Sequence, residues 1–260
     1  MKKIFDMHAN CGKWGSKADC NSLVTEIADS ENIEKLLVSN LGGLETEGLE
    51  PGNTPLLEEL DANRQTMAFC QLNPKMLAAA ICQVGHSTPD SIETALTEYN
   101  FRALRFHPYF QDISPTSEKY DPYMEIAKQY EIPCIFHAAP GKSDPANIYS
   151  LAKRHPKVKV VLYHLNLTGD CEYGIEVVQN SIRKRDARLY CNTSWVPLDM
   201  VVKAIQTLGS ERVMFGSDMP IDGENHFRYY RGIIQTIDSI FSEEDCNNYL
   251  YETANKLFDH

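Results

Sequence analysis

The sequence lacks the features that would direct the protein to a membrane or out of the cell. No stretch approaches the roughly 18 consecutive apolar residues of a membrane span, and no apolar signal-peptide segment follows Lys2 and Lys3. None of the eight cysteines forms a Cys-x-x-Cys pair, so we expect reduced thiols buried in the core. These absences predict a cytoplasmic protein.

Positive charge is also scarce, because 25 Lys and Arg residues stand against 36 Asp and Glu residues, for a formal net charge of -11. An acidic surface argues against nucleic acid or an anionic membrane as the main partner. A few arginines in a pocket can still attract a small anion locally. We therefore expect a small-molecule substrate, with no nucleic-acid and no membrane partner.

Short apolar segments alternate with longer amphipathic segments along all 260 residues. Runs such as VKVVLYHL are almost continuously apolar, which suits a parallel sheet buried on both faces. Eight strand-then-helix units predict an α/β fold, a single (β/α)8 TIM barrel over residues 1–260. A doubly wound open sheet is the alternative, weakened because no Gly-rich dinucleotide fingerprint follows the first strand.

Apolar periodicity and turn residues set the expected elements. The predicted strands are 3–8, 34–40, 77–84, 101–107, 132–138, 158–165, 187–193 and 211–217. The predicted helices are 17–30, 54–67, 89–99, 121–130, 145–155, 172–184, 198–208, 226–240 and 243–257. The Gly-rich acidic segment 40–55 follows the second strand, and we expect either a mobile loop over the site or an ordinary solvated loop.

Histidine or aspartate recurs at the ends of four predicted strands, as His8, His137, His164 and Asp218. The C-terminal ends of the strands form the catalytic face of such barrels. Imidazole and carboxylate are the usual ligands of zinc and similar ions. Each residue alone has an ordinary structural explanation, but four coincidences favour a metal-type hydrolytic site. Asn10 shares a face with His8 by strand alternation.

These motifs resemble the amidohydrolase superfamily, and specifically its amidohydrolase-2 branch, almost from end to end. That branch includes aminocarboxymuconate semialdehyde decarboxylase, benzoate-type decarboxylases and pyrone dicarboxylate lactonase. The resemblance rests on Asp6-Met7-His8, on FRALRFHP at 101–108, IFH at 135–137, VVLYH at 160–164, FGSDMP at 215–220 and NKLF at 255–258.

The resemblance implies a role for each of these side chains. His8 and His137 would be metal ligands, and Asp218 would bind the metal and take the proton from an attacking water. His164 would orient that water or the substrate. A divalent ion lowers the pKa of bound water from about 15.7 to about 7, and zinc is the preferred ion. The resemblance also implies a possible homo-oligomer.

Asn10 departs from the family pattern, which has a second histidine at this position. An amide oxygen is a weaker ligand than imidazole, and three interpretations remain open. In the first, Asn10 binds the metal weakly through oxygen. In the second, His8, His137 and Asp218 hold the metal, with or without His164. In the third, the site operates without metal.

Other candidates lie near the same strand ends. Arg105 or His107 could bind a substrate carboxylate, although an ion pair or a hydrogen-bonded histidine would explain them equally well. Trp14 could line the pocket, and Lys142 and Trp195 are further candidates. His226, near the start of the eighth helix, is expected to be a solvated surface residue.

The leading hypothesis is a metal-dependent hydrolase that acts on a lactone, amide or ester of a small, polar and carboxylated substrate. A nonoxidative decarboxylase on the same scaffold is the alternative, since related barrels share a site and differ in their loops. A catalytically silent, ligand-binding relative is the alternative of another class.

Overall fold

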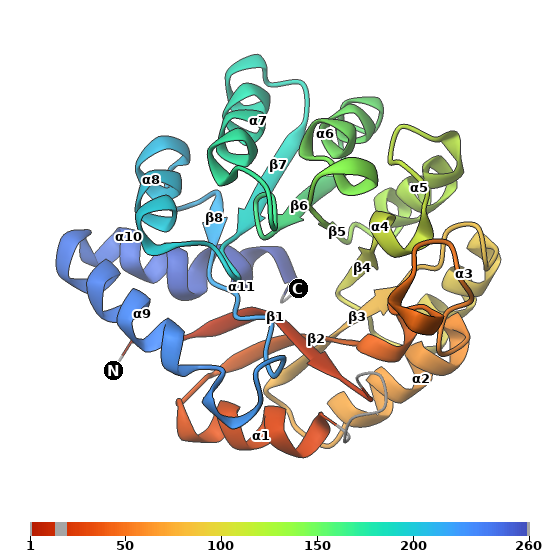
Figure 1. Ribbon diagram of the computed structural model, residues 1–260, viewed down its shortest axis with the longest axis horizontal. Coiled ribbons are helices and arrows are strands. Elements are labelled where there is room, and N and C mark those ends of the chain that lie inside the picture. The colour runs from red at the N-terminus through yellow and green to blue at the C-terminus, as the bar shows by residue number, and fades with distance from the viewer. Residues whose placement is uncertain (1, 14–19, 259–260) are drawn as a thin grey trace.

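A computed structural model of the protein, which describes residues 2–13 and 20–258, contains an eight-stranded parallel barrel surrounded by helices (Figure 1). This confirms the predicted (β/α)8 TIM barrel. The strands are β1 (Phe5–Cys11), β2 (Lys35–Asn40), β3 (Met76–Ile81), β4 (Ala103–Phe106), β5 (Cys134–His137), β6 (Lys159–Tyr163), β7 (Arg188–Asn192) and β8 (Val213–Met214). They pair in chain order from β1 to β8.

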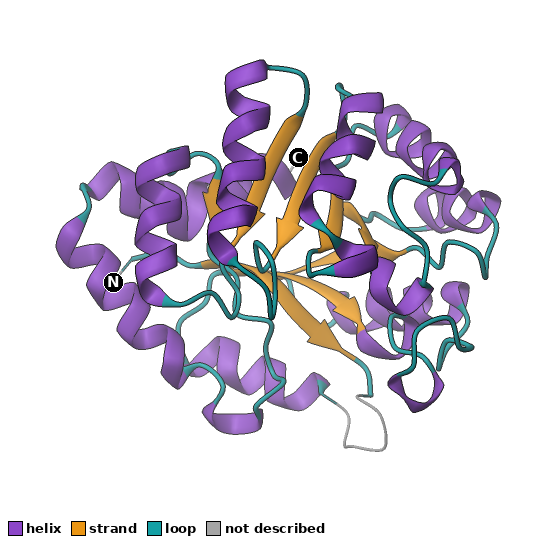
Figure 2. Cartoon of the chain, turned by 45° about the horizontal axis from the view of Figure 1, so that its top comes forward, coloured by secondary structure: helices purple, strands orange, loops and turns teal. Residues whose placement is uncertain are grey.

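Backbone hydrogen bonds between β1 and the segment after β8 close the barrel. The Met7 N–H donates to the Phe215 carbonyl at 3.2 Å, and the Asp218 N–H donates to the His8 carbonyl at 2.7 Å. In Figure 2 the strand arrows converge on the middle of the molecule, with the loops that follow them gathered there. Closure therefore brings the ends of the first and last strands together.

The helices lie outside the strands, as the amphipathic segments predicted. They are α1 (Asn21–Ser30), α2 (Glu59–Cys70), α3 (Pro89–Glu98), α4 (Pro108–Gln111), α5 (Asp121–Gln129), α6 (Pro145–Arg154), α7 (Cys171–Lys184), α8 (Leu198–Leu208), α9 (Arg228–Ile240), α10 (Glu243–Asn247) and α11 (Thr253–Phe258). α3 begins at Pro89 and α6 at Pro145. At α6 the Asp144 side chain accepts from the Ala146 N–H at 2.8 Å, which satisfies a free helix N–H.

The structure corrects several predicted boundaries. The first strand continues to Cys11 instead of ending at residue 8, and residues 17–19 of the first predicted helix lie outside the described residues. The predicted helix 243–257 is interrupted by a π-helical turn at Asn248–Glu252. Segment 40–55 contains two short 3-10 helices, at Leu41–Gly43 and Glu47–Leu49, which its glycines did not indicate.

The core consists of two large clusters and a small third one formed by Leu44, Ala62 and Ile81. A large cluster fills the space between strands and helices, and a second cluster fills the lower barrel with side chains such as Phe5, Met7 and Ile135. Leu257 and Phe258 of α11 close the lower end. Seven of the eight cysteines are buried and Cys171 is half-buried, in agreement with core-filling thiols.

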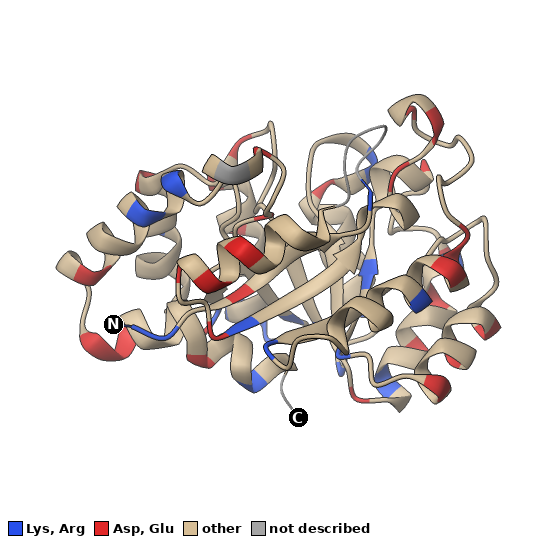
Figure 3. Ribbon diagram, turned by 90° about the horizontal axis from the view of Figure 1, so that it is seen from below, with Lys and Arg blue, Asp and Glu red and all other residues tan. Residues whose placement is uncertain are grey.

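Charge is distributed over the outside of the barrel, where acidic residues are spread along the outer helices (Figure 3). None of the helices in residues 2–13 and 20–258 combines the length and the apolar character that crossing a membrane would require.

Glu59 on α2 is a buried carboxyl whose titration should be visible in the stability of the fold. Its side chain is 1% exposed, and burial raises the pKa to about 7 from the model-peptide value of 4.5, although the Gln83 N–H donates to it. The folded protein thus favours the neutral form. Its contribution to stability is present below about pH 4.5 and is lost as the pH rises through about 7.

We therefore expect Glu59→Gln to abolish this pH dependence. The free energy of unfolding of the variant, relative to the wild type, should rise by about 3 kcal/mol between pH 4.5 and pH values above 7. Urea unfolding at a series of pH values measures it. Glu58→Gln is the matched control, because Glu58 is exposed. Parallel curves for wild type and Glu59→Gln would contradict the prediction.

Candidate functional site

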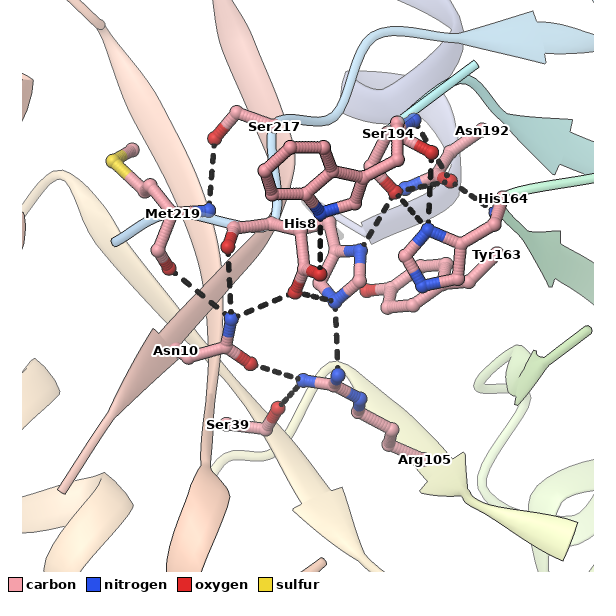
Figure 4. Close-up of polar contacts among 12 residues, drawn as sticks. His8, Asn10, Ser39, Arg105, Tyr163, His164, Asn192, Ser194, Ser217 and Met219 are labelled. Carbon is pink, nitrogen blue, oxygen red and sulfur yellow. Dashed lines mark hydrogen bonds and ion pairs between the residues drawn. The ribbon is translucent and has the colours of Figure 1, made fainter. Parts of the chain in front are cut away.

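A layer of polar side chains lies above the apolar interior of the barrel, on the C-terminal side of the strands. A bulge in β1 produces part of it, because Met7 and His8 together oppose the single residue Leu37 of β2. Beyond the bulge Ala9 and Cys11 pack among the helices. His8 and Asn10 consequently face the barrel axis, where Figure 4 shows them.

Three loop residues of the site have left-handed backbone conformations. His164 after β6, Trp195 after β7 and Asp218 after β8 have φ angles of 68°, 60° and 66°. Such angles are uncommon outside glycine, and they occur most often in Asn, Asp and His. Each residue lies just beyond the end of its strand. Figure 4 shows the His164 ring beside His8, and Trp195 Nε1 donates to Asp218 Oδ2. The shared geometry indicates a constructed site rather than ordinary loops.

Asp218 stands at the centre of the cluster. Its Oδ1 accepts from Asn10 Nδ2 at 2.8 Å and lies 2.8 Å from His8 Nε2, and its Oδ2 accepts from Trp195 Nε1 at 2.9 Å. Burial opposes ionisation, but the hydrogen bond with His8 and the positive charge of Arg105 outweigh it and hold the pKa of this carboxyl well below its usual range. Asp218 is therefore ionised, and 14% of its side chain remains exposed.

Ser194 joins the two histidines nearest to Asp218. Its Oγ lies 3.0 Å from His8 Nδ1 and 2.9 Å from His164 Nδ1, and it donates to Asn192 Oδ1 at 3.0 Å. Burial lowers the pKa of His8 to about 3 and also lowers that of His164. Both imidazoles are therefore neutral. In each ring Nδ1 faces Ser194, and Nε2 points away from Ser194.

Arg105 of β4 enters the cluster from below. Its Nη1 donates to Asn10 Oδ1 at 3.0 Å and to the Ser39 hydroxyl, and its Nη2 lies 2.8 Å from His8 Nε2. The guanidinium carbon lies 5.1 Å from the centre of the Tyr163 ring. The side chain is 4% exposed, and a guanidinium stays protonated in proteins. A fixed positive charge therefore lies inside the barrel.

His137 and His107 form a second pair beside the cluster. Their rings stack with centroids 4.0 Å apart, and His137 lies 5.1 Å from His164, ring to ring. Nδ1 of His137 is buried without a hydrogen-bond partner among the described residues. Burial, followed by the neighbouring His107, holds the pKa of His137 well below its usual value. This neutral histidine has an unused polar atom near the mouth of the site.

The predicted site residues are thus only partly brought together. Ligand atoms of His8, His164 and Asp218 lie within 4.8 Å of one another, and His137 lies outside this group. Asn10 contacts Asp218 and Arg105. The metal-ligand set stays a prediction. Trp14 lies outside the described residues, so its place in a pocket stays a prediction as well.

Two further expectations concerned residues around the site. His226 is buried, 3% exposed, and its Nε2 lies 2.9 Å from the Ser217 carbonyl; the expectation of a solvated residue was wrong, because the chain after Asp218 folds back over the barrel. Lys142 is about half exposed and pairs with Asp112 at 3.3 Å.

Sequence reasoning missed Ser39, Asn192 and Ser194. Ser39 and Asn192 each lie one residue before the end of a predicted strand. Ser194 directly follows the predicted strand that contains Asn192. Their position was therefore a usable indication. Their side chains carry no chemistry distinctive enough to separate them from ordinary strand-end residues.

Together, the closed parallel barrel and the polar cluster at its C-terminal end define a TIM-barrel protein with an enzyme-like site. The chain belongs to the amidohydrolase family, whose sequence profile matches residues 56–260. No curated protein matches the sequence.

Solved structures of similar fold include decarboxylases and a hydrolase. A 2,6-dihydroxybenzoate decarboxylase complexed with 2,6-dihydroxybenzoate has a TM-score of 0.77 and 13% identity, covering 100% of both chains. A dihydroxybenzoic acid decarboxylase from Polaromonas sp. JS666, with bound manganese and 2-nitroresorcinol, has a TM-score of 0.75 and 13% identity, covering 100% of this chain and 97% of the other. A Pseudomonas putida protein assigned as a 2-pyrone-4,6-dicarboxylic acid hydrolase has values of 0.72 and 14%, covering 100% and 98%. These likenesses concern the fold.

The side chains present do not fit a divalent ion as the family pattern implies. His8, His164 and Asp218 are of the right chemical type. However, Nε2 of His8, the atom directed toward Asp218, is in contact with Arg105, and the oxygen of Asn10 accepts from the same guanidinium. A metal bound here would share its ligand atoms with the positively charged Arg105. Among the described side chains in contact with the His8 ring, only Asp218 would offset the charge of both.

Proposed function

We propose that the protein is a nonoxidative decarboxylase of a small carboxylate that carries a hydroxyl group next to the carbon bearing the carboxylate. The observation that supports this most directly is Asp218, an ionised and partly exposed carboxylate surrounded by a guanidinium and two neutral imidazoles. Such a group can accept a proton from a substrate hydroxyl and return it to carbon.

The protons and electrons of this reaction balance without a redox cofactor. Asp218 takes the hydroxyl proton, and the resulting oxyanion raises the electron density at the carbon that bears the carboxylate. The protonated Asp218 then delivers that proton to the carbon, the carbon–carboxylate bond breaks, and its electron pair returns to the ring as CO2 leaves. A proton from solvent restores the hydroxyl group.

The depth of the side chains supports one orientation for a bound substrate. Asp218, Trp195 and His137 are partly exposed, whereas His8 and Arg105 are buried below them. A planar substrate would approach from the exposed side, with the Trp195 indole available to cover one face. His164 would hold a substrate oxygen through its Nε2, since its Nδ1 faces Ser194.

The structural neighbours support the same substrate class, because two of those described above act on or bind dihydroxybenzoate-type compounds. Hydrolysis is the second candidate. An ionised Asp218 can equally take a proton from water, and one neighbour is assigned as a pyrone dicarboxylate hydrolase.

A reaction in deuterated water separates the candidates. We expect 2-hydroxylated and 2,6-dihydroxylated benzoates to release CO2, with one deuterium at the carbon that carried the carboxylate, detected by mass spectrometry. Benzoate without the hydroxyl is the matched control and should not react. Lactone or ester cleavage without CO2 release would favour the hydrolase, and no turnover of either panel would contradict both and favour a silent, ligand-binding relative.

A further inference from the structure

Arg105 occupies a cation position in the interior of the barrel. Three polar atoms surround its two terminal nitrogens: His8 Nε2 at 2.8 Å, Asn10 Oδ1 at 3.0 Å and the Ser39 hydroxyl. They come from the adjacent strands β1 and β2, where Asn10 and Ser39 are paired in register. The guanidinium is thus surrounded by nitrogen and oxygen atoms of the kind that bind a metal ion.

His8 Nε2, the ring nitrogen that faces the centre of the site, already has two close contacts. It lies 2.8 Å from Arg105 Nη2 and 2.8 Å from Asp218 Oδ1. The other ring nitrogen, Nδ1, lies 3.0 Å from the Ser194 hydroxyl. A histidine binds a metal through the lone pair of a ring nitrogen, and here a guanidinium lies against the nitrogen that a metal would need.

The His8 ring is already in contact with one carboxylate, Asp218, and one guanidinium, Arg105. A divalent ion bound to this ring would add two positive charges next to a guanidinium that is only 4% exposed. Uncompensated charge in a buried site is strongly disfavoured.

Asn10 completes the arrangement, because its amide offers one acceptor and two N–H donors side by side. Its oxygen accepts from Arg105, while its nitrogen donates to Asp218 Oδ1 at 2.8 Å and to the Met219 carbonyl at 3.1 Å. The amide therefore connects the cation to the carboxylate, and its oxygen is not free to bind a metal.

We propose that the Arg105 guanidinium takes the place of the divalent ion in this member of the family. Held by Asn10 and Ser39, it lies against the His8 ring and supplies a fixed positive charge beside the ring that contacts Asp218. Arg105 is a positioning residue, because it acts through His8 and Asp218 and is covered from the substrate side. The metal-free state holds whatever the reaction is; only its consequence for catalysis rests on the proposed decarboxylase function.

Metal content tests the proposal directly. We expect the purified wild-type protein to contain no stoichiometric divalent ion by inductively coupled plasma mass spectrometry. The electron paramagnetic resonance signal of added free Mn2+ should not decrease with protein, and a chelator should leave the thermal unfolding midpoint and the turnover unchanged. One equivalent of any divalent ion, or titration of Mn2+ to one site, would overturn the proposal.

Paired variants test whether Arg105 is the cause. Asn10→His alone restores the family's ligand but keeps the guanidinium, so it should bind Mn2+ no better than the wild type. Asn10→His combined with Arg105→Gln should bind Mn2+ at least about 100-fold more tightly than the wild type, because a positive charge within contact distance is removed. Equal affinity of the single and double variants, both folded by circular dichroism, would overturn it.

Metal binding and the proposed decarboxylation can still be tested separately if a variant does not fold. The wild-type Mn2+ titration decides the metal question without any substituted protein and without substrate. A protein that is metal-free but releases no CO2 from the benzoate panel would contradict only the proposed function. A protein that releases CO2 but holds stoichiometric metal would contradict only the role of Arg105.

Discussion

Replacing Asp218 by Asn is expected to reduce kcat/KM by about 1,000-fold or more, because proton transfer by a positioned carboxylate contributes about 100- to 10,000-fold. The amide keeps the size of the side chain and, like Asp, tolerates the left-handed backbone at φ 66°. It loses the basic oxygen that would take the substrate proton. Steady-state assays with the best hydroxybenzoate measure the effect, and the circular dichroism spectrum should not change.

Asp222→Asn is the matched control for this variant. Asp222 lies four residues further along the chain and is exposed, so its substitution should leave kcat/KM within about twofold, as expected for a screened surface charge. Retained turnover in Asp218→Asn would remove this carboxylate from the mechanism under both the decarboxylase and the hydrolase hypotheses.

His164→Asn is expected to lower kcat by about 100-fold, the lower limit for loss of a positioned acid, base or hydrogen-bonding group. His164 is 2% exposed, and its Nδ1 lies 3.0 Å from the Ser194 carbonyl. This contact directs Nε2 toward the site. Asn accepts the backbone φ of 68° at this position but is too short to reach the substrate oxygen.

The division between kcat and KM distinguishes this role from a structural one. Loss of an interaction made in the transition state lowers kcat and kcat/KM together, whereas loss of uniform binding raises KM alone. His86→Asn is the control, because His86 is exposed in the loop after β3 and should behave as wild type. A His164→Asn protein with unchanged kcat would show that this ring only packs against its neighbours.

The family pattern and the structure lead to different accounts of the same residues. The pattern assigns His8 and Asn10 to a metal, whereas in the structure both contact Arg105. Arg105 itself had been considered as a site for a substrate carboxylate. Its burial at 4% exposure and its three partners within the barrel favour an internal role.

The sequence by itself determined the barrel and the position of four residues of the polar cluster. Nearly continuous apolar segments predict parallel strands because such strands are buried on both faces. The two-residue period of side-chain direction along a strand placed His8 and Asn10 on one face, and the strand ends placed His164 and Asp218 at the C-terminal side of the barrel. These inferences depend on residues within one segment, and they were correct to within a few residues.

Only the tertiary structure decided which side chains of the cluster contact one another. Arg105 and Asn10 are 95 positions apart, and His8 and Ser194 are 186 apart. Their contacts exist because the β1 bulge and barrel closure set the depth of each side chain. Whether a histidine lone pair faces a metal or a guanidinium depends on distances of a few ångströms between distant segments, which no local pattern in the sequence contains.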